Sequence, residues 1–153
     1  LQKLSQIFPS FPFTASVGSA ADSLSLFSAS YYNAKKTSDV TQALHVSETV
    51  SFYDDWYMYT LLLNAPKREL ELQSERLLKP ILPNHELVET LAAYLEYGEN
   101  LNLASKKLFI HINTLKYRLQ KISSLLGCDL KDPHTRFRLR VAIVIRRYLE
   151  LGT

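Results

Sequence analysis

The segment that decides the fold of this chain is NLASKKLFIHINTLKYRLQKISSLLG, residues 102–127. It predicts a short helix over 103–108 with Asn102 as its cap, a break at Phe109 and Ile110, and a longer helix from His111 to Gly127. Apolar residues recur every three or four positions in the longer helix, at Leu115, Leu119, Ile122 and Leu126. Two helices joined by a tight turn predict a helix-turn-helix.

The side of the longer helix opposite this apolar stripe is polar or cationic. At about 100° per residue, it carries Asn113, Lys116, Tyr117, Gln120 and Lys121, with no carboxylate among them. Amides pair with adenine edges, lysine reaches guanine or phosphate, and hydroxyls suit phosphate oxygens. Base contacts usually come from the first turns of such a helix, which favours Ile112, Asn113, Thr114 and Tyr117 as the reading residues.

Other residues of the segment have two open interpretations each. Arg118 lies at the margin of the buried face, where it suits a structural ion pair as well as a phosphate contact. His111 is expected to be an N-cap, in a position from which it also reaches a phosphate. The candidate DNA-backbone contacts, each with a solvated surface position as its alternative, are Lys106, Lys107, Arg136, Arg138 and Arg140. Asn102 is included in the predicted DNA-binding set.

Two further helices are expected around this pair. Asn84 caps one that carries Leu87, Val88, Leu91 and Leu95 on one face and ends at Gly98. Asp132 and Pro133 begin the other, and its predicted buried stripe is Phe137, Val141, Val144, Ile145 and Tyr148. Four helices without strands predict a compact all-α domain over residues 84–153.

Positive charge is concentrated in this domain. Residues 1–83 contain 7 Lys or Arg and 8 Asp or Glu, whereas residues 104–148 contain 11 and 2. A concentrated basic surface is typical of a protein that binds a polyanion, because each neutralised phosphate releases counterions. The alternative is an ordinary solvated helix face.

The residues upstream of this domain mix strand and helix patterns. Strands are predicted at 13–17 and 49–53, each followed by a helix. The first helix is capped by Asp22 and is expected to bury Leu24, Phe27, Tyr31 and Ala34; the second is capped by Asp54 or Asp55. Residues 1–63 therefore form a small α/β segment, expected to be part of a larger domain, and residues 64–83 a connector with a helix over 67–78. The whole chain is predicted to be α+β.

Composition limits the class of protein. The chain has 153 residues, of which 46% are hydrophobic, and one cysteine, Cys128. Its longest aliphatic run, Val141 to Ile145, is far shorter than the ~20 residues of a membrane span, and no secretory signal is visible. Scattered histidines and the lack of a nucleophile turn or phosphate loop argue against an enzyme. We expect a cytoplasmic protein with no cofactor and no metal site.

The helix-turn-helix also resembles a known family. Asn100-Leu101-Asn102 and the string Ile110-His111-Ile112-Asn113-Thr114-Leu115-Lys116-Tyr117-Arg118-Leu119 are similar to the C-terminal domain of PucR/CdaR-type regulators of purine catabolism and sugar-diacid use. Asp132-Pro133 with Arg136-Phe137 resembles that family's last helix. A weaker similarity, through Val17-Gly18 and Phe52-Tyr53-Asp54-Asp55, extends to its GGDEF-like domain.

The resemblance implies a bacterial transcriptional regulator that binds operator DNA as a homodimer. It also implies that a region outside this chain senses an effector metabolite. Lys106-Lys107 depart from the family pattern, which puts the backbone contacts of the short helix in doubt, and the chain has no Gly-Gly-Asp/Glu-Glu-Phe string. The alternative function is a protein-interaction or dimerisation module that binds an acidic partner.

Overall fold

The structure is a computed structural model that describes residues 13–46 and 48–151. The chain divides between Ala65 and Pro66 into two compact units, an N-terminal unit and a C-terminal unit. Over the described residues, the N-terminal unit contains two strands and two helices in the order β-α-β-α, and five helices follow in the C-terminal unit. The predicted α+β class and the all-α nature of the helix-turn-helix region are confirmed.

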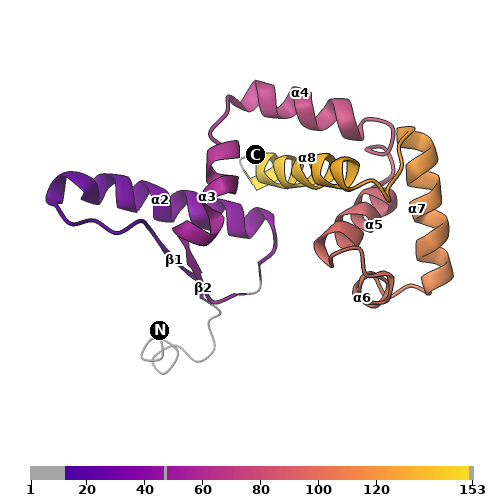
Figure 1. Ribbon diagram of the computed structural model, residues 1–153, viewed down its shortest axis with the longest axis horizontal. Helices are drawn as coiled ribbons and strands as arrows, with labels where there is room; N and C mark the ends of the chain where they lie inside the picture. Colours follow the sequence, from indigo (N-terminus) through magenta and orange to yellow (C-terminus); the bar gives the residue numbers. More distant parts are fainter. Residues whose placement is uncertain (1–12, 47, 152–153) are drawn as a thin grey trace. The chain divides into compact units, whose positions relative to one another are not determined.

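The N-terminal unit is built on a short parallel sheet. Strand β1 (Ala15–Val17) pairs with β2 (Val50–Phe52), with Ala15 opposite Val50. Helix α2 (Leu24–Ala43) connects the two strands and packs against both, and α3 (Tyr53–Leu62) follows β2 directly and packs against α2 (Figure 1). The strand and helix order predicted for this segment is correct.

The first half of α2 does not bury the stripe expected from its sequence. Leu24 is 93% exposed, and Phe27 and Tyr31 are also exposed. The buried residues of α2 are Thr37, Val40 and Ala43, near its other end. Two three-residue strands provide too little surface to cover a 20-residue helix, so the apolar spacing of the first turns has no buried counterpart in this unit.

The helix caps of this unit also differ from the prediction. Ser23 rather than Asp22 is the N-cap of α2, and Phe52 is the N-cap of α3. Asp54 and Asp55 lie in the first turn of α3, where a negative charge still interacts favourably with the helix dipole.

The C-terminal unit begins with the helix that the sequence suggested was a connector. Helix α4 (Lys67–Leu78) lies alongside α8 (Pro133–Leu151), as Figure 1 shows. Its buried residues are Leu70, Ser74 and Leu78. The unit therefore starts at Pro66, whereas the sequence placed the start of the domain at Asn84.

The remaining helices of this unit enclose one core. They are α5 (His85–Glu96), α6 (Leu101–Lys107) and α7 (Ile112–Leu126), and α5 contacts α6, α7 and α8. Leu91, Leu95, Leu115 and Ile122 are fully buried in this core, together with Leu78 and Ile81 from the segment before α5. Each such side chain contributes roughly 1.5–3 kcal/mol by leaving water, which fixes α7 against its neighbours.

Helix α8 buries a different set of residues from the predicted stripe. Val144 and Ile145 are buried as expected, but Phe137 is 65% exposed. Leu139, Ala142 and Ile143 are buried instead. Because α8 packs against α4 on one side and α5 on another, its middle turns are buried on more than one face.

Candidate DNA-binding site

Helix α6 begins two residues earlier than predicted. The side-chain oxygen of Asn100 accepts hydrogen bonds from the amides of Asn102 and Leu103, at 3.0 and 3.1 Å. Asn100 is therefore the N-cap, and the prediction that Asn102 caps this helix is wrong. Asn102 lies exposed in the first turn of α6.

The turn between α6 and α7 is tight. Leu108 ends α6, and Phe109 follows with a left-handed backbone, at φ 54°. The amide of Ile110 donates to the carbonyl of Ser105 at 3.1 Å. This bond closes the turn and directs the chain into α7.

His111 is the N-cap of α7, as predicted. Its Nδ1 accepts a hydrogen bond from the amide of Asn113 at 3.2 Å. A ring nitrogen that accepts carries no proton, so the cap requires Nδ1 to be unprotonated. The helix ends at Gly127, which adopts a left-handed conformation with φ 61°.

Helix α7 has the two faces that the sequence predicts. Leu115, Leu119 and Ile122 are buried, and α7 packs against α5 and α6. The opposite side, which we call the outer face, consists of Asn113, Lys116, Tyr117, Gln120 and Lys121, all of them exposed. Tyr117 is 64% exposed. Of the other predicted readers, Thr114 is exposed and Ile112 is partly buried.

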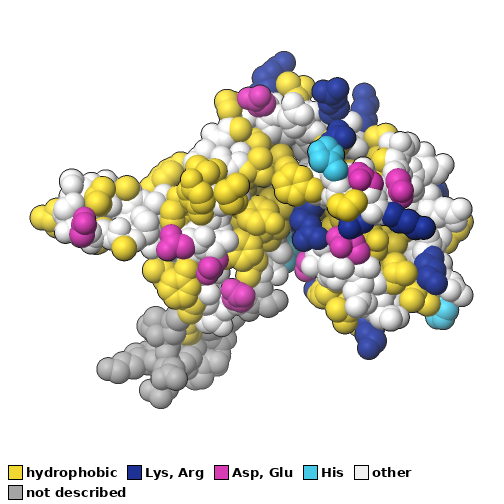
Figure 2. Space-filling model, viewed as in Figure 1, with side chains coloured by type: hydrophobic (Ala, Val, Ile, Leu, Met, Phe, Trp, Pro, Cys, Tyr) yellow, Lys and Arg dark blue, Asp and Glu magenta, His cyan; other side chains and the backbone are white. Residues whose placement is uncertain are grey.

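The charged side chains of α6 and α7 are all positive. Neither α6 nor α7 contains an acidic residue, and Lys106 and Lys107 are exposed in the last turn of α6. On the visible face of the C-terminal unit in Figure 2, Lys and Arg side chains lie over several elements, with acidic side chains among them. The α6–α7 pair therefore offers cationic and polar side chains, with no carboxylate of its own, to an anion.

Arg118 forms an ion pair within the unit. Its Nη2 lies 2.9 Å from Oε2 of Glu86, and its side chain is 21% exposed. This contact joins α7 to the first turn of α5. The geometry supports the structural interpretation of Arg118.

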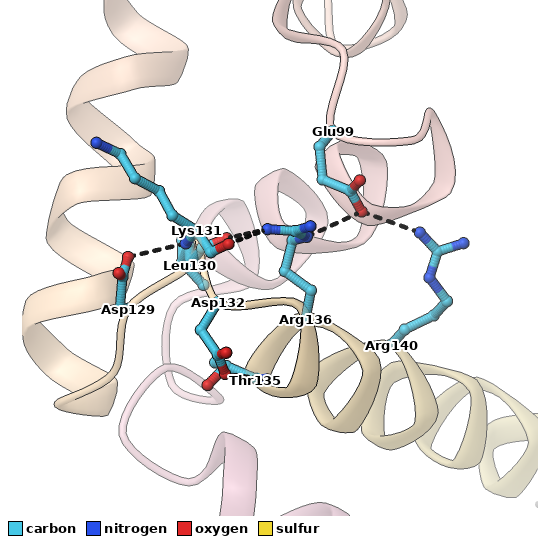
Figure 3. A network of polar contacts seen from close by, with 8 residues as sticks. All are labelled: Glu99, Asp129, Leu130, Lys131, Asp132, Thr135, Arg136 and Arg140. Atoms are coloured by element: carbon cyan, nitrogen blue, oxygen red, sulfur yellow. Dashed lines mark hydrogen bonds and ion pairs between the residues drawn. The ribbon is translucent and has the colours of Figure 1, made fainter.

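Two of the arginines proposed as backbone contacts meet at Glu99. Nε of Arg136 and Nη2 of Arg140 lie 3.5 and 3.1 Å from Oε1 of Glu99, as Figure 3 shows. Arg136 also donates to the carbonyl oxygens of Leu130 and Lys131. These contacts hold the start of α8 against the α5–α6 loop, whereas Arg138 is exposed. No local pattern in the sequence indicates this role for Glu99.

Burial and charge around this network affect two neighbouring groups. Burial is the main cause that raises the pKa of Tyr94, and the Glu99 carboxylate adds to it. Burial likewise raises the pKa of the Cys128 thiol, with a smaller contribution from Asp129.

Asp132 begins α8 as the sequence predicts. Its Oδ2 accepts from the amide of Thr135 at 2.7 Å. Hydrogen bonds from Thr135, first from its hydroxyl and then from its amide, hold the pKa of Asp132 below its usual value. The α7–α8 loop is fastened in a similar way, since Oδ1 of Asp129 accepts from the amide of Lys131 at 2.8 Å.

Within residues 13–46 and 48–151, no group of three His, Cys, Asp or Glu side chains is placed to hold a metal ion. Over the same residues, no helix is long and apolar enough to cross a membrane.

A comparison with protein-family models matches the region that contains the helix-turn-helix. Residues 87–145 match the family model described as PucR C-terminal helix-turn-helix domain. That range begins in α5 and extends through α7 into α8.

Regulatory proteins of bacteria are also similar to this chain, and two of them match a larger part of it. The purine catabolism regulatory protein of Bacillus subtilis is 33% identical over 118 residues, which is 77% of this chain and 19% of that protein. The carbohydrate diacid regulator of Escherichia coli is 34% identical over 137 residues, 86% of this chain and 35% of that protein. The DNA-binding transcriptional activator AdeR of B. subtilis is 45% identical over 60 residues, 39% of this chain and 14% of its own length.

The chain thus spans between about a seventh and a third of these relatives. The alignments with the first two are longer than the C-terminal unit and so include part of the N-terminal one. Together, the comparisons show that residues 87–145 are similar to the PucR C-terminal helix-turn-helix domain and that a longer part of the chain is similar to bacterial regulatory proteins.

Proposed function

We propose that this chain is the DNA-binding part of a sequence-specific transcriptional regulator and that α7 is its recognition helix. The observation that carries the proposal is the outer face of α7, which is exposed, free of carboxylates and fixed from behind by buried Leu115, Leu119 and Ile122. A rigid helix with a polar and cationic outer face is suited to the major groove of duplex DNA.

The exposed residues divide into two groups by chemistry. Asn113, Thr114 and Tyr117, in the first two turns of α7, are suited to read base edges, and Asn113 is able to pair bidentately with adenine. Ile112, half-buried at the helix start, suits an apolar contact with a thymine methyl group. Candidate phosphate contacts are Asn102, Lys106, Lys107, His111, Lys116, Gln120 and Lys121.

Arg118, Arg136 and Arg140 have a different expected role. Their ion pairs with Glu86 and Glu99 hold the scaffold in shape. Arg138 is exposed beside them and stays a candidate phosphate contact.

The regulator is proposed to act as a homodimer in the cytoplasm of a bacterium. One helix-turn-helix contacts few base pairs, and specificity generally comes from two half-sites about 34 Å apart. By analogy with the purine catabolism and carbohydrate diacid regulators, the target is a metabolic operon. The effector would bind to a region outside this chain, and residues 1–63 would be part of a GGDEF-like domain.

A titration of DNA binding against salt tests the proposal. Duplexes are selected from a random-sequence pool with the 153-residue chain, and the affinity for the most enriched duplex is measured at several salt concentrations. We expect log affinity to fall linearly with log salt, because bound phosphates release counterions. Asn113→Ala is expected to lose preference for the enriched duplex over a scrambled one, by about tenfold or more for a lost bidentate base contact, and to keep its non-specific binding.

A matched variant controls for general damage to the surface. Gln73→Ala removes an exposed amide from α4, outside the helix-turn-helix, and is expected to bind the enriched duplex like the parent. If no duplex is enriched and the chain instead binds an acidic protein, the interaction-module alternative is correct. If Asn113→Ala keeps full sequence preference, the assignment of the recognition residues is wrong.

A further inference from the structure

Three helices of the C-terminal unit end in the same way. A left-handed residue follows each of α5, α6 and α7, and the next amide reaches back to a carbonyl five residues earlier. The left-handed residues are Gly98 (φ 61°), Phe109 (φ 54°) and Gly127 (φ 61°). The closing bonds run from Glu99 to Tyr94 at 2.9 Å, from Ile110 to Ser105 at 3.1 Å, and from Cys128 to Ser123 at 3.1 Å.

Glycine is the ordinary residue in this position, because a Cβ makes the left-handed conformation unfavourable. The chain uses glycine after α5 and after α7. After α6, inside the helix-turn-helix, it places a phenylalanine instead. Phe109 therefore lowers the stability of the turn relative to glycine.

Burial does not compensate for this conformation. Phe109 is 96% exposed, which exceeds the exposure of Tyr117 and Phe137 in the same unit. Glu99 makes an instructive comparison, since it is also left-handed, at φ 62°, but its carboxylate binds Arg136 and Arg140. A strained and exposed aromatic ring with no contribution to the fold indicates a role outside the unit.

The surroundings of Phe109 indicate what the ring contacts. It follows the exposed Lys106 and Lys107 closely and precedes His111, the cap of the proposed recognition helix. A protein-docking patch needs a contiguous apolar area. Leu108 and Ile110 on either side of this ring are half-buried, and the nearest exposed residues along the chain, Lys106, Lys107 and His111, are cationic or polar. Beside DNA, the apolar groups within reach of such a turn are thymine methyl groups and deoxyribose rings.

We propose that Phe109 is a DNA-contacting residue, whose ring packs against the apolar surface of the duplex at the edge of the groove that α7 enters. The inference rests on the proposed function and adds an apolar contact to it. Because the contact is apolar, it contributes to affinity without releasing counterions.

Phe109→Gly separates this role from a structural one. The substitution gives the left-handed position its ordinary residue and removes no buried surface, so the midpoint of thermal unfolding is expected to stay the same or rise. Affinity for the duplex enriched from the random pool is expected to fall about tenfold, as for other single base-edge contacts, with an unchanged salt slope. Phe109→Leu, which keeps an apolar side chain, is expected to retain most of the affinity.

Two controls show whether the effect is specific to Phe109 and which part of the DNA the ring contacts. Leu72→Ala removes an exposed apolar side chain from α4 and is expected to leave affinity unchanged. Deoxyuridine in place of thymidine removes the methyl groups from the duplex. If it weakens the parent more than Phe109→Gly, the ring contacts thymine. If it weakens both equally, or neither, the ring contacts deoxyribose, because any shared loss then belongs to another residue such as Ile112.

Three outcomes overturn the inference. If Phe109→Gly binds the enriched duplex like the parent, or if its unfolding midpoint falls, Phe109 is not a DNA contact of this kind, and the proposed function stands. If the parent chain enriches no duplex at all, the inference fails together with the proposed function.

Discussion

At the scale of single residues, the helix-turn-helix depends on polar groups that satisfy the free amides at helix starts. Asn84, Asn100, His111 and Asp132 each accept a hydrogen bond from an amide two or three residues later. A helix whose first amides lack hydrogen-bond acceptors is less stable at its start. The caps therefore determine where α5 to α8 begin and which residues face outward.

Asn100 and Asn102 provide a matched test of this point. Asn100→Ala removes the acceptor for two amides and is expected to lower the free energy of unfolding by about 0.5–2 kcal/mol. Asn102→Ala, at an exposed position inside the same helix turn, is expected to change it by less than about 0.5 kcal/mol. Urea denaturation of both variants measures the difference. Equal effects would contradict the assignment of Asn100 as the cap.

Asp132 makes the start of α8 dependent on pH. Its pKa is lowered in the folded chain, mainly by the hydrogen bond from the Thr135 hydroxyl. The stability that it contributes is therefore complete above the ordinary pKa of an aspartate and is lost as pH falls through the lowered value. The stability difference between the parent and Asp132→Ala, measured by urea denaturation between neutral and acid pH, is expected to shrink as pH falls. A difference that grows on acidification would contradict this assignment.

At the scale of helices and strands, sequence periodicity predicts which elements form. It does not predict how much of each helix surface is buried by neighbouring elements. The pattern of α7 was correct, since its neighbours cover one face only. The stripe of α2 is wrong and that of α8 is correct only at Val144 and Ile145. Burial there depends on contacts that no local spacing encodes: a small sheet beneath α2 and two packing partners for α8.

The sequence indicates an ion pair as one of two interpretations of Arg118, but it indicates neither the ion pairs of Arg136 and Arg140 nor the partner of any of the three. Arg118, Arg136 and Arg140 have the same local features as phosphate contacts, and their carboxylate partners lie far away along the chain. The sequence therefore predicted the charge of the region but not which cations are engaged in the fold. The sequence indicates Phe109 only as part of the break between two helices, since its exposure and left-handed backbone appear only in the structure.

Glu99 is the element-scale link between the α5–α6 loop and α8. Glu99→Gln removes the charge that two arginines share and is expected to lower the free energy of unfolding by about 0.5–2 kcal/mol, a range reduced for partial solvent exposure. The measurement is urea denaturation, with Arg146→Gln as a control for an exposed pair within one helix. The control is expected to lose about 0.3–0.5 kcal/mol. A Glu99→Gln variant as stable as the parent would show that the network does not hold α8.

At the scale of the whole molecule, the chain contains two units, of which the C-terminal one has its own hydrophobic core. The core residues from Leu78 to Ile143 all belong to that unit, and α4 completes it by packing along α8. A unit with its own core is able to fold alone.

A pair of fragments tests where this unit begins. The fragment of residues 66–153 is expected to unfold cooperatively and to bind duplex DNA. The fragment of residues 84–153 lacks the buried Leu70, Leu78 and Ile81, and is expected to be less stable by several kcal/mol, since each lost side chain of this kind costs about 2–5 kcal/mol. Thermal unfolding followed by circular dichroism measures both. Equal stability of the two fragments would show that the C-terminal unit begins at Asn84, as the sequence predicts.

The most direct test of the central claim is a map of the surface that contacts DNA. Backbone amide NMR shifts of the chain are recorded as the enriched duplex is added. The account predicts the largest changes at Asn113, Lys116 and Tyr117, on the exposed side of α7, with small changes in α4. Shifts that cluster on α4 or on the N-terminal unit, with α7 unaffected, would contradict it.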